Sequence, residues 1–185
     1  MSKDLLRYVK LPVKPLVRKY LEAKYGAPLR ITRKTNEGKM LISLFRSMQH
    51  DARFDSRMHV YTDEITMEVS VNKLHKRMRG RQFTSRAVFD FSDFVETQIS
   101  DSFNAFADVL RSTGYRWTVN DIYTMFIQRY GLTPDDIAFE TLKRGYNRYR
   151  DALNEVSVME VKIVEKKSAV IVPPTLSYDE MRAAS

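Results

Sequence analysis

The sequence of 185 residues contains no cysteine, and this absence excludes disulfide bonds, thiolate metal sites and cysteine nucleophiles. Long apolar runs are also missing, and no stretch approaches the length that a bilayer-spanning helix needs. The opening segment, MSKDLLRYVK, has neither the apolar stretch nor the small-residue cleavage site of a secretory signal. We therefore expect a cytoplasmic protein without membrane contact.

Glycine is scarce as well, with six residues in the chain, and most of them stand where a helix is expected to stop or the backbone to turn. The sequence has no glycine-rich loop that could cradle a phosphate, and no serine in the pattern of a nucleophile elbow. Its three histidines, His50, His59 and His75, lack the i, i+4 spacing of a metal-binding pair on a helix. These absences predict no cofactor and no resident metal.

One set of acids could in principle support catalysis. Asp63, Glu64 and Glu68 lie close together in the sequence and could hold Mg²⁺ for nuclease chemistry. In an extended strand, however, Asp63 points to the opposite face from Glu64 and Glu68, so the three carboxylates do not converge. We expect no catalytic centre, and an enzyme acting on nucleic acid is the weakest alternative.

What the chain does have is an excess of positive charge. Lysine and arginine number 31 against 23 aspartate and glutamate, which gives a formal net charge of +8 and a pI near 9.6. Hydrophobic residues make up 43% of the chain and charged residues 29%, which is ordinary for a folded domain. This balance favours polyanionic partners, with nucleic acid first and acidic proteins or anionic membranes second.

The spacing of apolar residues predicts about five helices. The first predicted helix is 12–25, with Pro15 in its first turn, and the second is capped by Asn36. The third is 92–112, with Ser92 as its N-cap, and the fourth is 119–130. The fifth runs from Pro134 through Arg150, with Thr133 as its N-cap. Gly26 and Gly114 are expected to stop two of them, and Gly131 to begin a tight connection between the last two. Residues 49–58 have no clear period and are expected to form a loop.

The clearest strand is 60–71, where apolar and polar residues alternate, so that one face can lie on the core and the other in water. A single strand is not stable alone and needs a partner. The candidate partners are 29–32, the segment around 86–91, and 156–164. The last segment is rich in β-branched residues, which favours a strand, although a continued helix stays open there.

Together these elements predict an α+β fold dominated by helices. It would contain about five helices, a small sheet of two to four strands and a helix-turn-helix-like hairpin at 119–150. We expect a single globular domain over residues 1–167. Residues 168–185, which contain two consecutive prolines, are expected to form a disordered tail.

The helix pair at 119–150 is the first candidate for function. Two helices joined by a short turn with glycine form the helix-turn-helix arrangement, whose second helix can enter the major groove of DNA. Arginine and asparagine side chains suit bidentate contacts with guanine and adenine edges. The expected solvent-facing stripe of the second helix consists of Lys143, Arg144, Asn147 and Arg148.

The beginning of that second helix is less favourable for DNA. Recognition helices usually approach the bases with their first residues, and here these include Asp135, Asp136 and Glu140, whose charge has the same sign as phosphate. Binding would have to use the C-terminal half of the helix, as in a homeodomain. The alternative interpretation is an ordinary helical hairpin with a solvated basic face.

A second candidate is the segment 72–86, which contains six lysine or arginine residues and no acid. Cationic side chains at this density can neutralise several phosphates, and each contact makes binding more sensitive to salt. The alternative is a solvated connector whose charge balances acids elsewhere. The basic residues are Lys73, Lys76, Arg77, Arg79, Arg81 and Arg86, of which Lys76, Arg77, Arg79 and Arg81 are the expected phosphate contacts.

In its general character, as a small basic chain, the sequence resembles the uncharacterised small basic proteins encoded on bacterial prophages and other mobile elements. The resemblance implies a DNA-handling or virion-associated role and transfers no site residues. We expect a nucleic-acid-binding accessory or regulatory protein without catalysis, with duplex DNA favoured. The alternative is a structural or protein-interaction module, a virion component or oligomeric adaptor, that binds a partner or a second copy through an uncovered strand edge or through 156–164.

Overall fold

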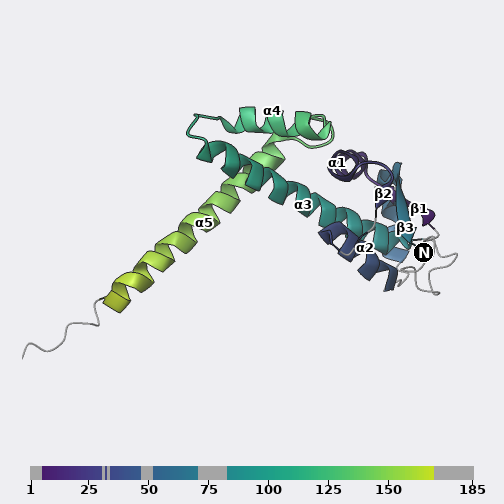
Figure 1. Cartoon of the computed structure of the whole chain (residues 1–185), viewed down its shortest axis with the longest axis horizontal. Helices are drawn as coiled ribbons and strands as arrows, with labels where there is room; N and C mark the ends of the chain where they lie inside the picture. The colour runs from purple at the N-terminus through teal and green to yellow at the C-terminus, as the bar shows by residue number, and fades with distance from the viewer. Residues whose placement is uncertain (1–5, 31, 33, 47–51, 71–82, 169–185) are drawn as a thin grey trace, which may run out of the picture. The chain divides into compact units, whose positions relative to one another are not determined.

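The computed structural model describes residues 6–30, 32, 34–46, 52–70 and 83–168. Within them the chain forms six helices and three strands, so the predicted helix-dominated α+β class is confirmed (Figure 1). The chain divides into two compact units, residues 1–146 and 147–185. The single domain over 1–167 stays a prediction, and the tail predicted at 168–185 lies outside the described residues except for residue 168, which ends the last helix.

One long helix organises the first unit. The helices are α1 (Pro15–Tyr25), α2 (Asn36–Arg46), the 3-10 helix η1 (Ala52–Val60), α3 (Ser85–Ser112), α4 (Val119–Tyr130) and α5 (Phe139–Ser168). α3 contacts α1, α2, η1, α4 and the first strand, and is therefore the central helix of this unit. No helix in the described part of the chain is long and apolar enough to cross a bilayer.

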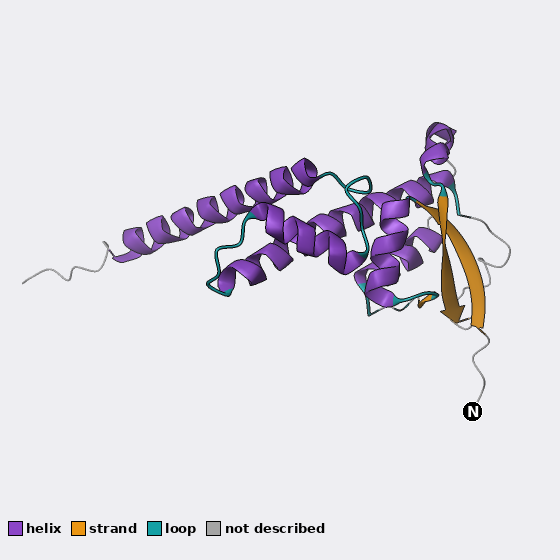
Figure 2. Ribbon diagram, turned by 90° about the horizontal axis from the view of Figure 1, so that it is seen from above, coloured by secondary structure: helices purple, strands orange, loops and turns teal. Residues whose placement is uncertain are grey.

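The sheet has three strands in the order β1-β3-β2. β1 (Leu6–Val13) is antiparallel to β3 (Asp63–Ser70), and β2 (Leu29–Arg30) is parallel to β3 on its other side. β3 and β2 confirm the strands predicted within 60–71 and 29–32. Helices cover one face of the strands, as Figure 2 shows.

Several predicted elements differ from the structure in their bounds or type. The helix predicted from residue 12 begins at Pro15, because residues 12 and 13 pair with β3 as the end of β1. The segment 86–91 lies in α3, and 156–164 continues α5 as a helix. No proline interrupts the sequence between 139 and 168, so nothing in the backbone chemistry stops α5 there.

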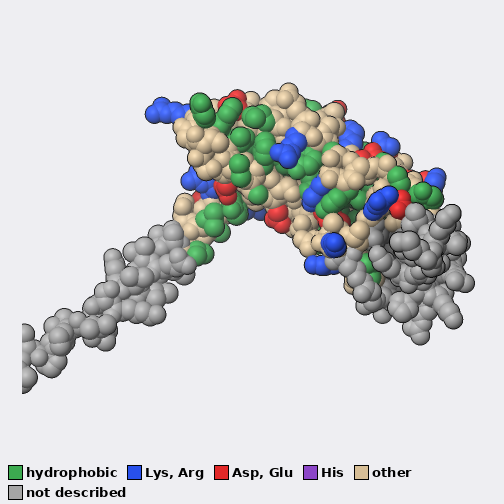
Figure 3. Space-filling model, in the orientation of Figure 1, with side chains coloured by type: hydrophobic (Ala, Val, Ile, Leu, Met, Phe, Trp, Pro, Cys, Tyr) green, Lys and Arg blue, Asp and Glu red, His purple; other side chains and the backbone are tan. Residues whose placement is uncertain are grey.

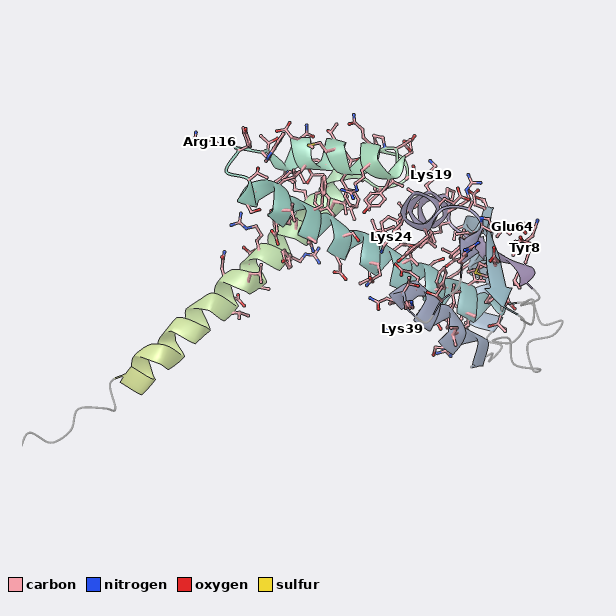
Figure 4. The ribbon with its side chains drawn as sticks, in the orientation of Figure 1. Tyr8, Lys19, Lys24, Lys39, Glu64 and Arg116 are labelled. Atoms are coloured by element: carbon pink, nitrogen blue, oxygen red, sulfur yellow. The ribbon has the colours of Figure 1, made fainter. Side chains whose placement is uncertain are left out.

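Buried and exposed side chains alternate along β3, as predicted, and also along β1. Tyr8 and Glu64 lie on the solvent face of the sheet (Figure 4). The opposite face packs into the hydrophobic core together with the helices that cover it. Its almost fully buried side chains are Leu11, Val13, Ile65 and Met67.

α3 begins at Ser85 and not at Ser92. The Thr84 hydroxyl accepts a hydrogen bond from the Ala87 N–H at 3.3 Å and so caps the helix. Ser92 lies inside α3 and is 1% exposed. The predicted start at Ser92 rested on an apolar stripe that begins near Phe91, whereas the buried stripe of α3 already begins at Ala87. Most of the loop expected at 49–58 is also helical, because residues 52–60 form η1.

The connection between α4 and α5 is longer than the tight turn expected. α4 ends at Gly131, which adopts the left-handed conformation (φ 61°), but α5 begins at Phe139 and not at Pro134. The Asp136 carboxylate accepts hydrogen bonds from the backbone N–H (2.7 Å) and the hydroxyl (2.8 Å) of Thr133. These bonds close a separate turn. Thr133 and Pro134 begin this turn, and not the helix that the sequence predicts there.

A buried polar cluster joins α1, α2 and α3. Glu37 is 2% exposed, and its carboxylate accepts hydrogen bonds from Lys24 Nζ (2.9 Å) and Tyr25 Oη (2.7 Å). Lys24 Nζ also donates to Tyr20 Oη (3.3 Å), which lies 2.6 Å from Ser102 Oγ. Burial opposes ionisation of Glu37, but the bonds from Tyr25 and Lys24 outweigh it, so the pKa of Glu37 lies below its ordinary value.

Candidate nucleic-acid interface

Aromatic packing anchors the first turns of α5. Tyr146 is 1% exposed, and its ring meets Phe103 of α3 edge-on, with centroids 6.1 Å apart and an interplanar angle of 84°. The Tyr146 hydroxyl donates a hydrogen bond to Asp108 at 3.2 Å. Leu142, one turn earlier, is 2% exposed. Leu142 and Tyr146 therefore face the core, on the side of the helix opposite the predicted solvent-facing stripe.

Three of the four predicted contact residues on α5 are exposed: Arg144, Asn147 and Arg148. Arg144 belongs to the first unit, whereas Asn147 and Arg148 are the first residues of the second. Within the described part of the chain, neither arginine forms an ion pair. Both guanidinium groups are therefore available to an anionic ligand.

Lys143, the fourth predicted residue, is engaged within α5. Its Nζ lies 3.2 Å from a carboxylate oxygen of Glu140 and 5.3 Å from the centre of the Phe139 ring. The pair is largely exposed, with 41% and 57% of the two side chains accessible, so it contributes little to stability. Lys143 would have to leave Glu140 to contact a phosphate.

Of the two acids just before α5, Asp135 and Asp136, only one is exposed to a ligand. Asp136 is turned inward, with 7% of its side chain accessible, and it forms an ion pair with Lys19 of α1 at 2.7 Å. Burial opposes its ionisation, but the hydrogen bonds from Lys19 and Thr133 outweigh this, so the pKa of Asp136 lies below its ordinary value. Asp135 remains exposed just before the helix.

The basic segment lies mostly outside the described residues. Its expected phosphate contacts, Lys76, Arg77, Arg79 and Arg81, all fall within 71–82, which the structure does not describe. Arg86 is described, in the first turn of α3, where it forms an ion pair with Asp90 at 3.6 Å. The segment joins the end of β3 to the cap of α3.

Each of the three acids considered for a metal site is paired with a cation from a neighbouring element. The pairs are Asp63 with Arg18 (3.0 Å), Glu64 with Lys10 (2.8 Å) and Glu68 with Arg30 (3.3 Å). Across the parts of the chain that the structure describes, no group of three or more histidine or acidic side chains could hold a metal ion. The three acids are thus balanced locally by cations.

Sequence reasoning missed a second exposed group, in the loop between α3 and α4. Tyr115 is 74% exposed, and Arg116 beside it is exposed as well. Trp117 is partly exposed, with its ring centre 6.2 Å from that of Tyr115. The available signal was their position between Gly114 and Thr118, outside both helical stripes.

Two candidate contacts therefore stand out among the described residues of the first unit. One is Arg144 on α5, and the other is Arg116 with its aromatic neighbours in the loop between α3 and α4. The chain matches no protein-family model and shows no significant similarity to a curated protein or to a solved structure. A proposal about its function therefore rests on these residues.

Proposed function

We propose that this chain is a nucleic-acid-binding accessory or regulatory protein of a phage or other mobile element, with duplex DNA as its partner and no catalysis. The observation that carries the proposal is the exposed stripe of Arg144, Asn147 and Arg148 on α5. These are the side chain types best suited to bidentate contacts with base edges in the major groove. Leu142 and Tyr146 hold the opposite face of the helix in the core.

The charge distribution supports an anionic partner. Residues 71–82 contain five lysine or arginine residues and no acid, so the rest of the chain has 26 basic residues (31 − 5) against 23 acidic ones. More than half of the net charge of +8 therefore falls in one short segment. Such a segment suits backbone phosphates, which supply affinity without reading sequence.

The position of Glu140 determines which part of α5 would approach DNA. Glu140 is exposed at the start of the helix, so the first turn would face phosphates with the wrong sign of charge. Arg144 and Arg148 are one turn apart, about 6 Å along the axis. We therefore place the contact on the second and third turns of α5.

The test is fluorescence anisotropy of labelled random duplex DNA at two salt concentrations, using wild-type protein and Arg144→Ala/Arg148→Ala. Replacing both arginines should weaken binding roughly tenfold, since the variant loses two cations from the surface proposed to contact the duplex. The matched control is Lys34→Ala/Lys39→Ala, which removes the same charge from two exposed lysines around α2.

Two outcomes would contradict the proposal. If wild-type protein does not bind duplex DNA at low salt, the net charge serves another purpose, such as solubility. If the two double variants weaken binding equally, overall charge and not the α5 stripe accounts for the affinity.

A second candidate is a structural or protein-interaction module, and one observation favours it. β1 is an edge strand of the sheet, so one of its sides has no strand partner among the described residues. Lys10 and Pro12 within β1 are residues that discourage edge pairing. The segment 156–164 cannot serve as a pairing strand, because it is helical. A monomer by light scattering at high concentration would exclude self-association through β1.

A further inference from the structure

The loop between α3 and α4 presents an unusual surface. Among the large hydrophobic side chains that the structure describes, Tyr115 is the most exposed, at 74%. Arg116 lies next to it at the tip of the loop (Figure 4). In Figure 3 a basic side chain projects from this end of the helices beside a group of hydrophobic ones. An aromatic ring and a cation are thus offered to solvent together.

The loop is held in place by its own hydrogen bonds. The Thr113 hydroxyl donates to the Leu110 carbonyl (2.6 Å) and accepts from the Trp117 indole N–H (3.3 Å). The Trp117 backbone N–H donates to the Tyr115 carbonyl at 3.0 Å. Thr118 then caps α4. Because the backbone is already ordered, a ligand that binds Tyr115 would lose little affinity to ordering the loop.

The charge around the loop favours an anionic ligand. Arg116 forms no ion pair with a described residue. Asp121, the nearest acid in the sequence, accepts hydrogen bonds from the backbone N–H (3.0 Å) and hydroxyl (2.7 Å) of Thr118 in the capping box of α4. These bonds hold the Asp121 carboxylate at the helix end, and among the described residues it forms no ion pair with Arg116.

We propose that Tyr115 and Arg116 form a contact for single-stranded nucleic acid, in which an unpaired base stacks on the Tyr115 ring and Arg116 binds the adjoining phosphate. Stacking on an exposed aromatic ring accepts any base, because every base has a π-face. A duplex does not offer such a face, since its bases are stacked on one another. The contact rests on the proposed nucleic-acid binding but uses a surface separate from the α5 stripe.

Trp117 makes the contact directly measurable. It is the only tryptophan in the chain, and its ring centre lies 6.2 Å from that of Tyr115. A base stacked on Tyr115 should therefore change the tryptophan fluorescence. The experiment titrates the full chain with a single-stranded oligothymidylate, and in parallel with an abasic oligonucleotide of the same length and charge. We expect quenching by oligothymidylate and little or none by the abasic strand.

Three variants define the contribution of the ring. Tyr115→Ala should weaken oligothymidylate binding at least fivefold, and Tyr115→Phe should retain most of the affinity because its ring can still stack. The matched control is Tyr8→Ala, which removes a tyrosine that is 62% exposed on the sheet. This control should bind like wild type. Both positions are on the surface, so the variants should fold, which circular dichroism would verify.

The outcomes separate this contact from the proposed function. Equal quenching by the abasic strand would show that charge alone acts, and would overturn the stacking contact. An unchanged affinity of Tyr115→Ala, with duplex binding intact, would overturn the contact while the proposed function stands. Failure of wild-type protein to bind either nucleic acid would overturn both, and would point to a protein partner for the loop.

Discussion

Glu37 shows how a single buried charge can define local structure. Its carboxylate is 2% exposed and is held by Lys24 and Tyr25, so it connects the start of α2 to the end of α1. Burial and the hydrogen bond to Glu37 also raise the pKa of Tyr25 to about 12, which keeps that hydroxyl a neutral donor. Removing the charge of Glu37 would leave Lys24 without its anionic partner.

We predict that Glu37→Gln lowers the free energy of unfolding at neutral pH by about 1–3 kcal/mol, since Lys24 loses its anionic partner and one of the two donors, Lys24 or Tyr25, faces an amide NH2 in place of an acceptor. Because the folded-state pKa of Glu37 is lowered, its contribution is complete above the unfolded pKa and disappears as the pH falls through the lower folded value. Wild type and variant should therefore converge in stability at acidic pH. Urea unfolding at neutral and acidic pH measures this.

The control for Glu37 is Glu64→Gln, which removes a carboxylate from an exposed pair with Lys10. Surface pairs of this kind contribute roughly 0–1 kcal/mol, so the change in stability should be small. A Glu37→Gln protein as stable as Glu64→Gln at neutral pH would show that the buried pair adds no net stability.

At the scale of elements, Asp136 holds the connection between α4 and α5 in place. It closes the turn with Thr133 and pairs with Lys19, so it joins the connection before α5 to α1. Asp136→Ala would leave the Thr133 N–H and the Lys19 ammonium without their acceptor. We predict a decrease of about 1–3 kcal/mol in the free energy of unfolding, measured by urea denaturation. Asp135→Ala, at the exposed neighbour, should change it by no more than about 0.5 kcal/mol.

The elements that the sequence predicts correctly are those with local signals. α4 runs over 119–130 as expected, because Thr118 and Asp121 form a capping box and Gly131 has the positive φ of a helix end. Thr133 and Pro134 show the limit of such signals. They match the start of a helix in type and order, and Asp136 bonds to Thr133 as Asp121 does to Thr118, yet only a turn follows and α5 begins later, at Phe139.

The elements that the sequence does not predict depend on distant contacts. β1 alternates as β3 does, but its pairing with β3, fifty or more residues later in the chain, is not visible in any local pattern. In the candidate site the periodicity of α5 correctly places Arg144 and Arg148 on the exposed face. Tyr115 and Arg116 have no periodicity to reveal them, since their exposure results from how α3 ends and α4 begins.

At the scale of the whole molecule, charge is distributed in two different ways. Each of the three acids of β3 is paired with one cation, from β1, β2 or α1, so these acids do not form an unbalanced negative patch. The excess is concentrated in residues 71–82, with five cations and no acid. If this segment binds backbone phosphates, it should control the salt dependence of binding, while the α5 stripe should control the preference for sequence.

We therefore predict that Arg77→Ala/Arg79→Ala weakens binding to AT-rich and GC-rich duplexes by the same factor. For each phosphate that the variant no longer neutralises, the plot of log affinity against log salt should become shallower by about 0.9, so its slope should change by nearly two units. Anisotropy titrations over a salt series measure both quantities, with Lys34→Ala/Lys39→Ala as the charge-matched control. An unchanged slope would mean that these arginines do not reach phosphates, and the affinity would then have to come from the helices alone.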